Sequence, residues 1–272
     1  MGRRGFTRLI RVRLLTGIIS LVVSTILSTP PCQAAESHRQ VNKPVSLQTF
    51  VNNPTKLTED VELLKLHTVQ ATMTRTNVVH LVRSPLQFMP QWIRVLAMAG
   101  KQLDAMNHCN PEQDNCPNEM LLWKMILQKV KDLPFLEQLK LVNAYFNRWP
   151  YRSDIDVYGV SEYWASPQEF LQKSGDCEDY SIIKYFALKQ LGVPDEQMSI
   201  VLLTDVIRNI QHAVLVVRSG QDSYLLDNLS DLLLPQEKYS HYLPLYSINE
   251  SYRWAYVTTT SLHKGNHIIN DF

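Results

Sequence analysis

Apolar residues recur at helical spacing along three stretches in the middle of the chain. Residues 91–106, 118–131 and 134–149 each carry an apolar stripe with polar residues between, which predicts three amphipathic helices. Pro134 can open the third helix, because a proline at the first helical position loses only an N–H that has no partner within the helix. A further short helix is predicted over residues 167–171.

A fourth amphipathic helix is predicted around residue 180. Its apolar residues repeat at helical spacing, and the repeat ends before Gly192 and Pro194, a combination that terminates helices. The helix therefore begins near Asp176 or Cys177 and ends near Leu191. Its apolar stripe predicts burial against a sheet.

The pattern changes to that of strands after this helix. Residues 198–204, 211–218 and 224–227 predict three strands, and the middle one is apolar on both faces, as expected for a central strand. Residues 59–83 show no clear period and predict weak order, and residues 150–166 are aromatic-rich and predict an irregular segment. A helical N-terminal half followed by an antiparallel sheet indicates an α+β fold.

The first 34 residues have the pattern of an export signal. Five arginines without any acid precede an apolar run over residues 14–27, and small residues suited to cleavage follow. The run is shorter than the roughly 20 residues of a spanning helix, and an uncleaved inner-membrane anchor over residues 14–29 is the alternative. We expect a periplasmic protein with residues 35–107 as an N-terminal extension of unknown role and residues 108–272 as the globular domain.

The charge balance argues against one class of partner. The chain has 27 Lys and Arg residues and 26 Asp and Glu residues, but five of the arginines lie in the signal, so the rest is slightly acidic. Nucleic-acid-binding domains normally carry a basic patch, and the sequence shows none. We therefore expect no nucleic-acid partner.

The four cysteines divide into three groups. Cys32 lies within the export signal and would leave with it. Cys109 and Cys116 flank a polar, turn-rich loop, which in an oxidising compartment predicts a local disulfide, although two unpaired thiols on a loop are the alternative. Cys177 is then the odd cysteine of an exported protein, which indicates a reactive thiol or an intermolecular bond.

The position of Cys177 suits a nucleophile. Free N–H groups and a partial positive charge at a helix N-terminus favour the thiolate, which is the nucleophilic form of cysteine. The same N–H groups can bind the oxyanion of an acyl-transfer intermediate. The alternative is a buried structural thiol, which is the more common role of a lone cysteine.

A histidine and an aspartate come together if the last two strands form a tight hairpin. With Ser219-Gly220 as a two-residue turn, His212 and Asp227 lie directly opposite each other, with their Cβ atoms about 5 Å apart. A carboxylate beside an imidazole orients the ring and stabilises the imidazolium, as in catalytic triads. Alternatively, His212 is a polar strand-end residue and Asp227 an ordinary turn former.

Acidic residues surround the cysteine. Asp176, Glu178 and Asp179 can act simply as a helix cap and as partners of the helix dipole. Negative charges raise the pKa of a neighbouring thiol, however, so a nucleophile here needs a compensating positive charge. A bound cation would supply it, and oxygen-rich ligands suit calcium better than zinc.

Several short motifs occur in order between residues 121 and 256. They are Leu141-Val142-Asn143, Phe146-Asn147, Tyr163-Trp164-Ala165-Ser166-Pro167, Glu169-Phe170-Leu171, Gly175-Asp176-Cys177-Glu178-Asp179-Tyr180, Lys184-Tyr185, Leu191-Gly192-Val193-Pro194, His212-Ala213-Val214-Leu215 and Leu226-Asp227-Asn228. In these motifs the chain resembles the bacterial transglutaminase-like cysteine proteinases. The resemblance implies a papain-like, transglutaminase-type fold with Cys177 as nucleophile, His212 as general base and Asp227 as the residue that orients the histidine.

The resemblance also implies an activity. In the characterised branch of this family the acids beside the cysteine are tied to calcium dependence, which carries onto Asp176, Glu178 and Asp179. That branch cleaves a large surface adhesin near its N-terminus, at a site with paired alanines, and an inner-membrane cyclic di-GMP receptor sequesters the protease to control biofilm release. We therefore expect a calcium-dependent periplasmic cysteine endopeptidase with such a substrate and such a receptor.

The chain departs from that branch in three respects. It has an extension before about residue 107, it carries the Cys109/Cys116 pair, and Glu162 stands where an aspartate is expected. Two other functions stay open. One is transamidation, in which an amine intercepts the same acyl-enzyme, and the other is a non-catalytic periplasmic adaptor that keeps the fold, against which the presence of all three triad residues argues.

Overall fold

The computed structural model describes residues 80–110 and 116–257. The predicted export signal and residues 35–79 of the predicted extension lie outside the described residues. Within the described part of the chain, no helix has the length and apolar character needed to cross a membrane.

Six α-helices occur in the described ranges, and five of them match the predicted ones closely. They are α4 (Pro90–His108), α5 (Asn118–Val130), α6 (Phe135–Phe146), α7 (Asp154–Tyr158), α8 (Pro167–Lys173) and α9 (Cys177–Gln190). The prediction of an irregular segment over residues 150–166 was wrong at α7. This helix is only five residues long, too short for an apolar repeat, and it is defined by its ends: Ser153 caps it, and Gly159 ends it in the left-handed conformation with φ 70°.

Seven strands form one antiparallel sheet. They are β1 (His80–Ser84), β2 (Met198–Asp205), β3 (Ile210–Ser219), β4 (Asp222–Asp227), β5 (Ser230–Pro235), β6 (Tyr242–Ile248) and β7 (Arg253–Val257). Their order is β1-β7-β6-β2-β3-β4-β5, so β3 has a neighbour on both sides, as predicted. Strand β1 was predicted as weakly ordered, and β5 to β7 were not predicted. These four strands depend on pairing partners that alternation within a short segment does not reveal.

The hairpin between β3 and β4 differs in register from the prediction. Ser219 pairs with Asp222, so the turn consists of Gly220 and Gln221, with Gly220 at φ 63°. Glycine adopts this left-handed conformation without the Cβ clash that other residues meet. Compared with the expected turn, the pairing moves by two residues, so His212 and Asp227 are diagonal rather than directly opposite. A shift by an even number keeps both side chains on the same face of the sheet.

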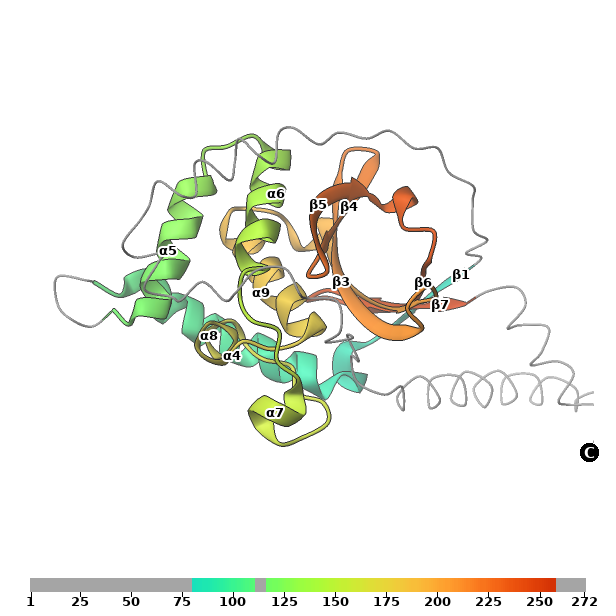
Figure 1. The fold of residues 1–272 in the computed structure, drawn as a ribbon, viewed down its shortest axis with the longest axis horizontal. Helices are drawn as coiled ribbons and strands as arrows, with labels where there is room; N and C mark the ends of the chain where they lie inside the picture. Colours follow the sequence, from blue (N-terminus) through green and yellow to red (C-terminus); the bar gives the residue numbers. More distant parts are fainter. Residues whose placement is uncertain (1–79, 111–115, 258–272) are drawn as a thin grey trace, which may run out of the picture.

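The helices and the sheet enclose the main hydrophobic core. Figure 1 shows the helices gathered on one side of a strongly curved sheet, with α9 next to β3. Twelve of the fourteen residues of α9 are buried, so this helix lies inside the fold rather than on its surface. A smaller cluster around Val201, Val214 and Leu225 forms a second core within the sheet region.

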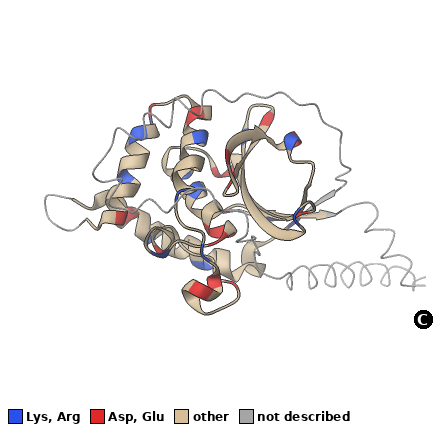
Figure 2. Cartoon of the chain, in the orientation of Figure 1, with Lys and Arg blue, Asp and Glu red and all other residues tan. Residues whose placement is uncertain are grey.

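The predicted disulfide between Cys109 and Cys116 is formed. It joins the end of α4 to the start of α5, with a Cα–Cα distance of 4.9 Å, within the usual range for disulfides. Figure 2 shows Lys and Arg residues interspersed with Asp and Glu residues along the helices.

Candidate active site

The N-terminus of α9 is built by a reciprocal cap. Asp176 is the N-cap residue, and Asp179 reaches back so that its Oδ2 accepts a hydrogen bond from the Asp176 N–H at 3.3 Å. Gly175 makes this close return possible, because a Cβ atom at this position would lie 1.9 Å from Oδ2 of Asp179. The motif around the cysteine is therefore first of all a local device that fixes where the helix begins.

Cys177 is the first residue of α9 and is 1% exposed. Its sulfur lies 3.4 Å from Oε2 of Glu178. A thiolate at this position would meet a carboxylate as well as the favourable end of the helix dipole.

His212 and Asp227 form the predicted pair. His212 lies in β3 and Asp227 ends β4, and the imidazole Nε2 is 2.9 Å from Oδ1 of the carboxylate. Both side chains are almost completely buried. The even register shift preserved this contact, because diagonal neighbours on one face stay within reach of long side chains.

Asp227 remains a carboxylate despite its burial. Burial by itself raises its pKa, but the charge and hydrogen bond of His212, the backbone N–H of Leu229 at 2.9 Å and the hydroxyl of Tyr242 at 2.7 Å together lower the pKa to about 2. A carboxylate with these donors stays ionised at neutral pH and can stabilise an imidazolium.

The second ring nitrogen of His212 is available as a base. Nδ1 is buried and has no hydrogen-bond partner among the described residues. A buried polar atom without a partner needs an explanation, and a ring nitrogen that is left free to accept a proton would supply one.

Tyr242 belongs to this arrangement and was not identified from the sequence. Its hydroxyl donates to Oδ2 of Asp227 at 2.7 Å, and its ring packs against the His212 ring with 5.7 Å between centroids. It lies at the start of β6, a strand that the sequence pattern did not predict. No local signal singles out one tyrosine among the 12 in the chain.

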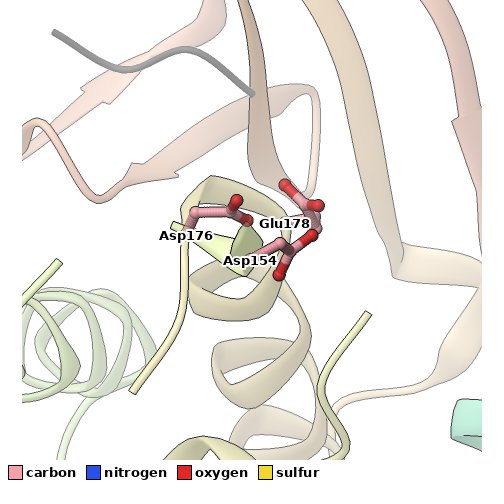
Figure 3. Close-up of side chains that lie close together, drawn as sticks. All are labelled: Asp154, Asp176 and Glu178. Atoms are coloured by element: carbon pink, nitrogen blue, oxygen red, sulfur yellow. The ribbon is translucent and has the colours of Figure 1, made fainter. Parts of the chain in front are cut away.

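Three buried carboxylates converge beside the start of α9 (Figure 3). Asp154, Asp176 and Glu178 each offer one oxygen, and these oxygens lie within 4.8 Å of one another. All three residues are less than 5% exposed. One carboxylate oxygen of Asp154 and one of Asp176 have no hydrogen-bond partner among the described residues.

The pKa values of this acidic cluster (Asp154, Asp176 and Glu178) show that its negative charges lack a compensating positive charge. Burial raises the pKa of Asp154 to about 6 and that of Asp176 to about 8, and nearby carboxylates contribute to both shifts. Burial and the charge of Asp176 raise the pKa of Glu178 well above its usual value. Three buried carboxylates require either protons or a cation, and oxygen ligands of this kind suit calcium.

Unlike Asp176 and Glu178, the other two predicted metal ligands, Asp179 uses both of its carboxylate oxygens in hydrogen bonds to backbone N–H groups. Its Oδ1 accepts a hydrogen bond from the backbone N–H of Ala165 at 2.6 Å, while Oδ2 completes the helix cap. The structure therefore groups Asp176 and Glu178 with Asp154 instead. Asp154 was missed because an acid directly after the capping Ser153 looks like an ordinary helix-start residue.

Two of three comparisons with known proteins found similar ones. The family model described as bacterial transglutaminase-like cysteine proteinase matches residues 98–261. The solved structure of Legionella pneumophila LapG is 30% identical, with a TM-score of 0.47 over 61% of this chain and 91% of that one. Its EGTA-treated and calcium-bound forms match at 29% and 30% identity, each with a TM-score of 0.47, over 62% of this chain and 93% and 94% of theirs. No curated protein sequence matches significantly.

Proposed function

We propose that this chain, which belongs to the bacterial transglutaminase-like cysteine proteinases, is an endopeptidase that works through Cys177, His212 and Asp227. The observation that carries the proposal is the His212–Asp227 pair. One ring nitrogen bonds an ionised carboxylate, and the other is buried without a partner. A buried imidazole with one nitrogen bonded to a carboxylate and the other unpaired is the arrangement of the base in a catalytic triad.

The reaction follows from these groups. His212 Nδ1 takes the thiol proton while the sulfur attacks the carbonyl carbon of the scissile peptide bond. The tetrahedral intermediate collapses when His212 returns the proton to the leaving amine, which leaves a thioester on Cys177. A water molecule, deprotonated by His212, then attacks the thioester and releases the carboxylate product and the thiol. Asp227 holds the Nε2–H throughout and stabilises the imidazolium.

The acidic cluster supports calcium dependence. Asp154, Asp176 and Glu178 would supply carboxylate oxygens to the ion, and one oxygen of Asp154 and one of Asp176 have no hydrogen-bond partner in the described ranges. A bound cation would neutralise the charges beside the Cys177 sulfur and so favour its thiolate. The proposal thus connects the cluster to catalysis through the pKa of the nucleophile.

The substrate and location rest on the export-signal pattern and the family resemblance. We place the enzyme in the periplasm, where it would cleave a surface or secreted protein of the adhesin type and so act in biofilm control. An inner-membrane cyclic di-GMP receptor would then be its regulatory partner.

Mapping of new protein N-termini tests the activity without a known substrate. Exported proteins from the source cells are incubated with reduced wild-type protein in calcium, or with Cys177→Ala, and new N-termini are labelled and sequenced. We expect sites near the N-terminus of a large surface protein that appear only with the wild type. Identical termini in both samples would contradict the proposal. Incorporation of a labelled amine instead of hydrolysis would indicate transamidation.

A further inference from the structure

We infer that Tyr242 is a positioning residue for the catalytic pair, acting through Asp227. The inference rests on the proposed function, since it assigns a role within the same site. Tyr242 contacts both members of the pair: it donates a hydrogen bond to Oδ2 of Asp227 and packs its ring against His212.

The carboxylate of Asp227 is held at both oxygens. Oδ1 accepts from His212 Nε2 and from the backbone N–H of Leu229, while Oδ2 accepts from the Tyr242 hydroxyl. Without the donor on Oδ2, the carboxylate can rotate about its Cβ–Cγ bond and move Oδ1 away from the imidazole. The Tyr242 hydroxyl therefore fixes the plane in which Asp227 meets His212.

The ring of Tyr242 restricts the orientation of the His212 imidazole. Its plane makes an angle of 67° with that of His212, an edge-to-face arrangement that packing favours. Tilting of the imidazole toward Tyr242 would break this contact. One side chain thus limits the rotation of the carboxylate and of the ring, and the alignment of His212 Nδ1 depends on both.

The position of Tyr242 is itself fixed by neighbouring elements. Tyr242 pairs with Asp205 at the end of β2, and the Asp205 carboxylate accepts hydrogen bonds from the backbone of Ile207 and Arg208 in the next turn. The ring of Tyr239 stacks on Tyr242 with 5.2 Å between centroids. The hydroxyl of Tyr242 also stays protonated, because burial and the Asp227 charge raise its pKa far above the usual value.

The test uses iodoacetamide as a probe, so no substrate is needed. Alkylation of reduced Cys177 is followed by mass spectrometry at pH 6, where an ordinary thiol with a pKa of about 8.5 reacts slowly. We expect wild-type Cys177 to react much faster than glutathione, because the imidazolium holds it as a thiolate. Tyr242→Phe should slow alkylation about tenfold, the scale of one hydrogen bond to a charged group.

A double-mutant cycle separates positioning from general loosening. In an Asp227→Asn background, the further change Tyr242→Phe should have no effect on the alkylation rate, because the carboxylate through which Tyr242 acts is no longer there. Tyr239→Phe is the matched control, since its buried hydroxyl has no hydrogen-bond partner among the described residues, and its rate should equal that of the wild type.

Two results would overturn the inference alone: wild-type speed in Tyr242→Phe, or an equal slowing of alkylation with and without Asp227. A wild-type Cys177 that is alkylated no faster than glutathione would remove the proposed function as well, so the two failures are distinguishable.

Should Tyr242→Phe fail to fold, 3-fluorotyrosine at position 242 replaces it. Because the fluorinated phenol donates a stronger hydrogen bond to Asp227, the carboxylate stabilises the imidazolium less. The part of the profile of alkylation rate against pH that depends on the histidine should therefore move to lower pH. An unmoved profile overturns the inference.

Discussion

The pKa values of the buried carboxylates of this site are shifted in opposite directions. Asp227 is surrounded by donors, and its pKa falls to about 2 although it is almost fully buried. Asp154 and Asp176 have too few donors, and their pKa values rise to about 6 and about 8. The difference lies in the neighbouring charges and the hydrogen bonds: Asp227 faces the charge of His212 and several donors, whereas Asp154 and Asp176 have other carboxylates nearby.

The acidic cluster should make thermal stability depend on pH and calcium together. The pKa values of Asp154 and Asp176 lie above the unfolded value of about 3.9, so between about pH 4 and 8 the folded protein binds more protons than the unfolded chain. Stability in EGTA should therefore fall as pH rises through this range. The increase in Tm on adding calcium should grow from pH 5 to pH 8, since protons compete with the ion.

Asp154→Asn gives a sharper form of the same measurement. It removes one charge from the cluster without touching the helix cap, so the Tm in EGTA at pH 8 should rise while the calcium response shrinks. Asp132→Asn, an exposed acid outside the cluster, should change neither quantity. A calcium response that is the same at pH 5 and pH 8, or the same in Asp154→Asn, would show that the ion binds elsewhere.

Helix α9 is the element that brings fold and chemistry together. It is buried on nearly all sides, it begins with the cysteine, and it packs against the strand that carries His212. Its start depends on glycine at position 175, because the Asp179 side chain occupies the space that a Cβ there would need. Its middle is held to α6 by Lys184, whose ammonium donates to the side-chain oxygens of Asn143 and Asn147. Both features position Cys177 without taking part in the reaction.

Gly175→Ala should weaken both the fold and the activity. The new Cβ would meet Asp179 Oδ2 at 1.9 Å, so the cap must open or the helix must move. We expect the free energy of unfolding in urea to fall by about 1–3 kcal/mol, the range for an overpacked buried site. Gly100→Ala, in the middle of α4 with no atom within 4 Å of the new Cβ, should instead stabilise the protein by about 0.5–1 kcal/mol. A neutral Gly175→Ala would contradict the role assigned to the cap.

Asn147 links the cysteine helix to the aspartate of the triad. Its Oδ1 accepts from Lys184 of α9, and its Nδ2 donates to the carbonyl oxygen of Asp227. Asn147→Ala leaves a buried ammonium and a carbonyl with fewer partners, so we expect a loss of about 2–3 kcal/mol in urea unfolding and lower activity in native protein. Asn107→Ala, which removes an exposed side-chain contact, should stay within about 0.5 kcal/mol of the wild type. Equal stability losses in the two variants would argue against this link.

At the scale of the whole molecule, the Cys109–Cys116 disulfide closes a short loop between α4 and α5 and stabilises the fold. A reductant should therefore lower Tm. In the absence of reductant, Cys109→Ser/Cys116→Ser should be less stable by about 2–3 kcal/mol, from the chain entropy of a loop of this length. With reductant present, its activity should equal that of the wild type. Activity that depends on the Cys109–Cys116 bond would contradict this assignment.

Local patterns predicted the helices better than the strands. Residues 118–131 and 134–149 carry apolar repeats long enough to determine a buried face by themselves, and both helices are present. Strands β5 to β7 are short, and their stability comes from neighbours far away in the sequence. The hairpin estimate failed by one position of the turn, yet His212 and Asp227 still met, because an even register shift preserves the face.

The sequence by itself determined that Cys177 starts a helix, that His212 and Asp227 share one face of a hairpin, and that acids flank the thiol, because these properties depend on residues close together in the chain. Only the tertiary structure brought Asp154 into the acidic cluster, bound Asp179 to the backbone of Ala165 and placed Tyr242 on the His212–Asp227 pair. These contacts join separate elements. They depend on how α7, α9 and β6 pack, which no local pattern encodes.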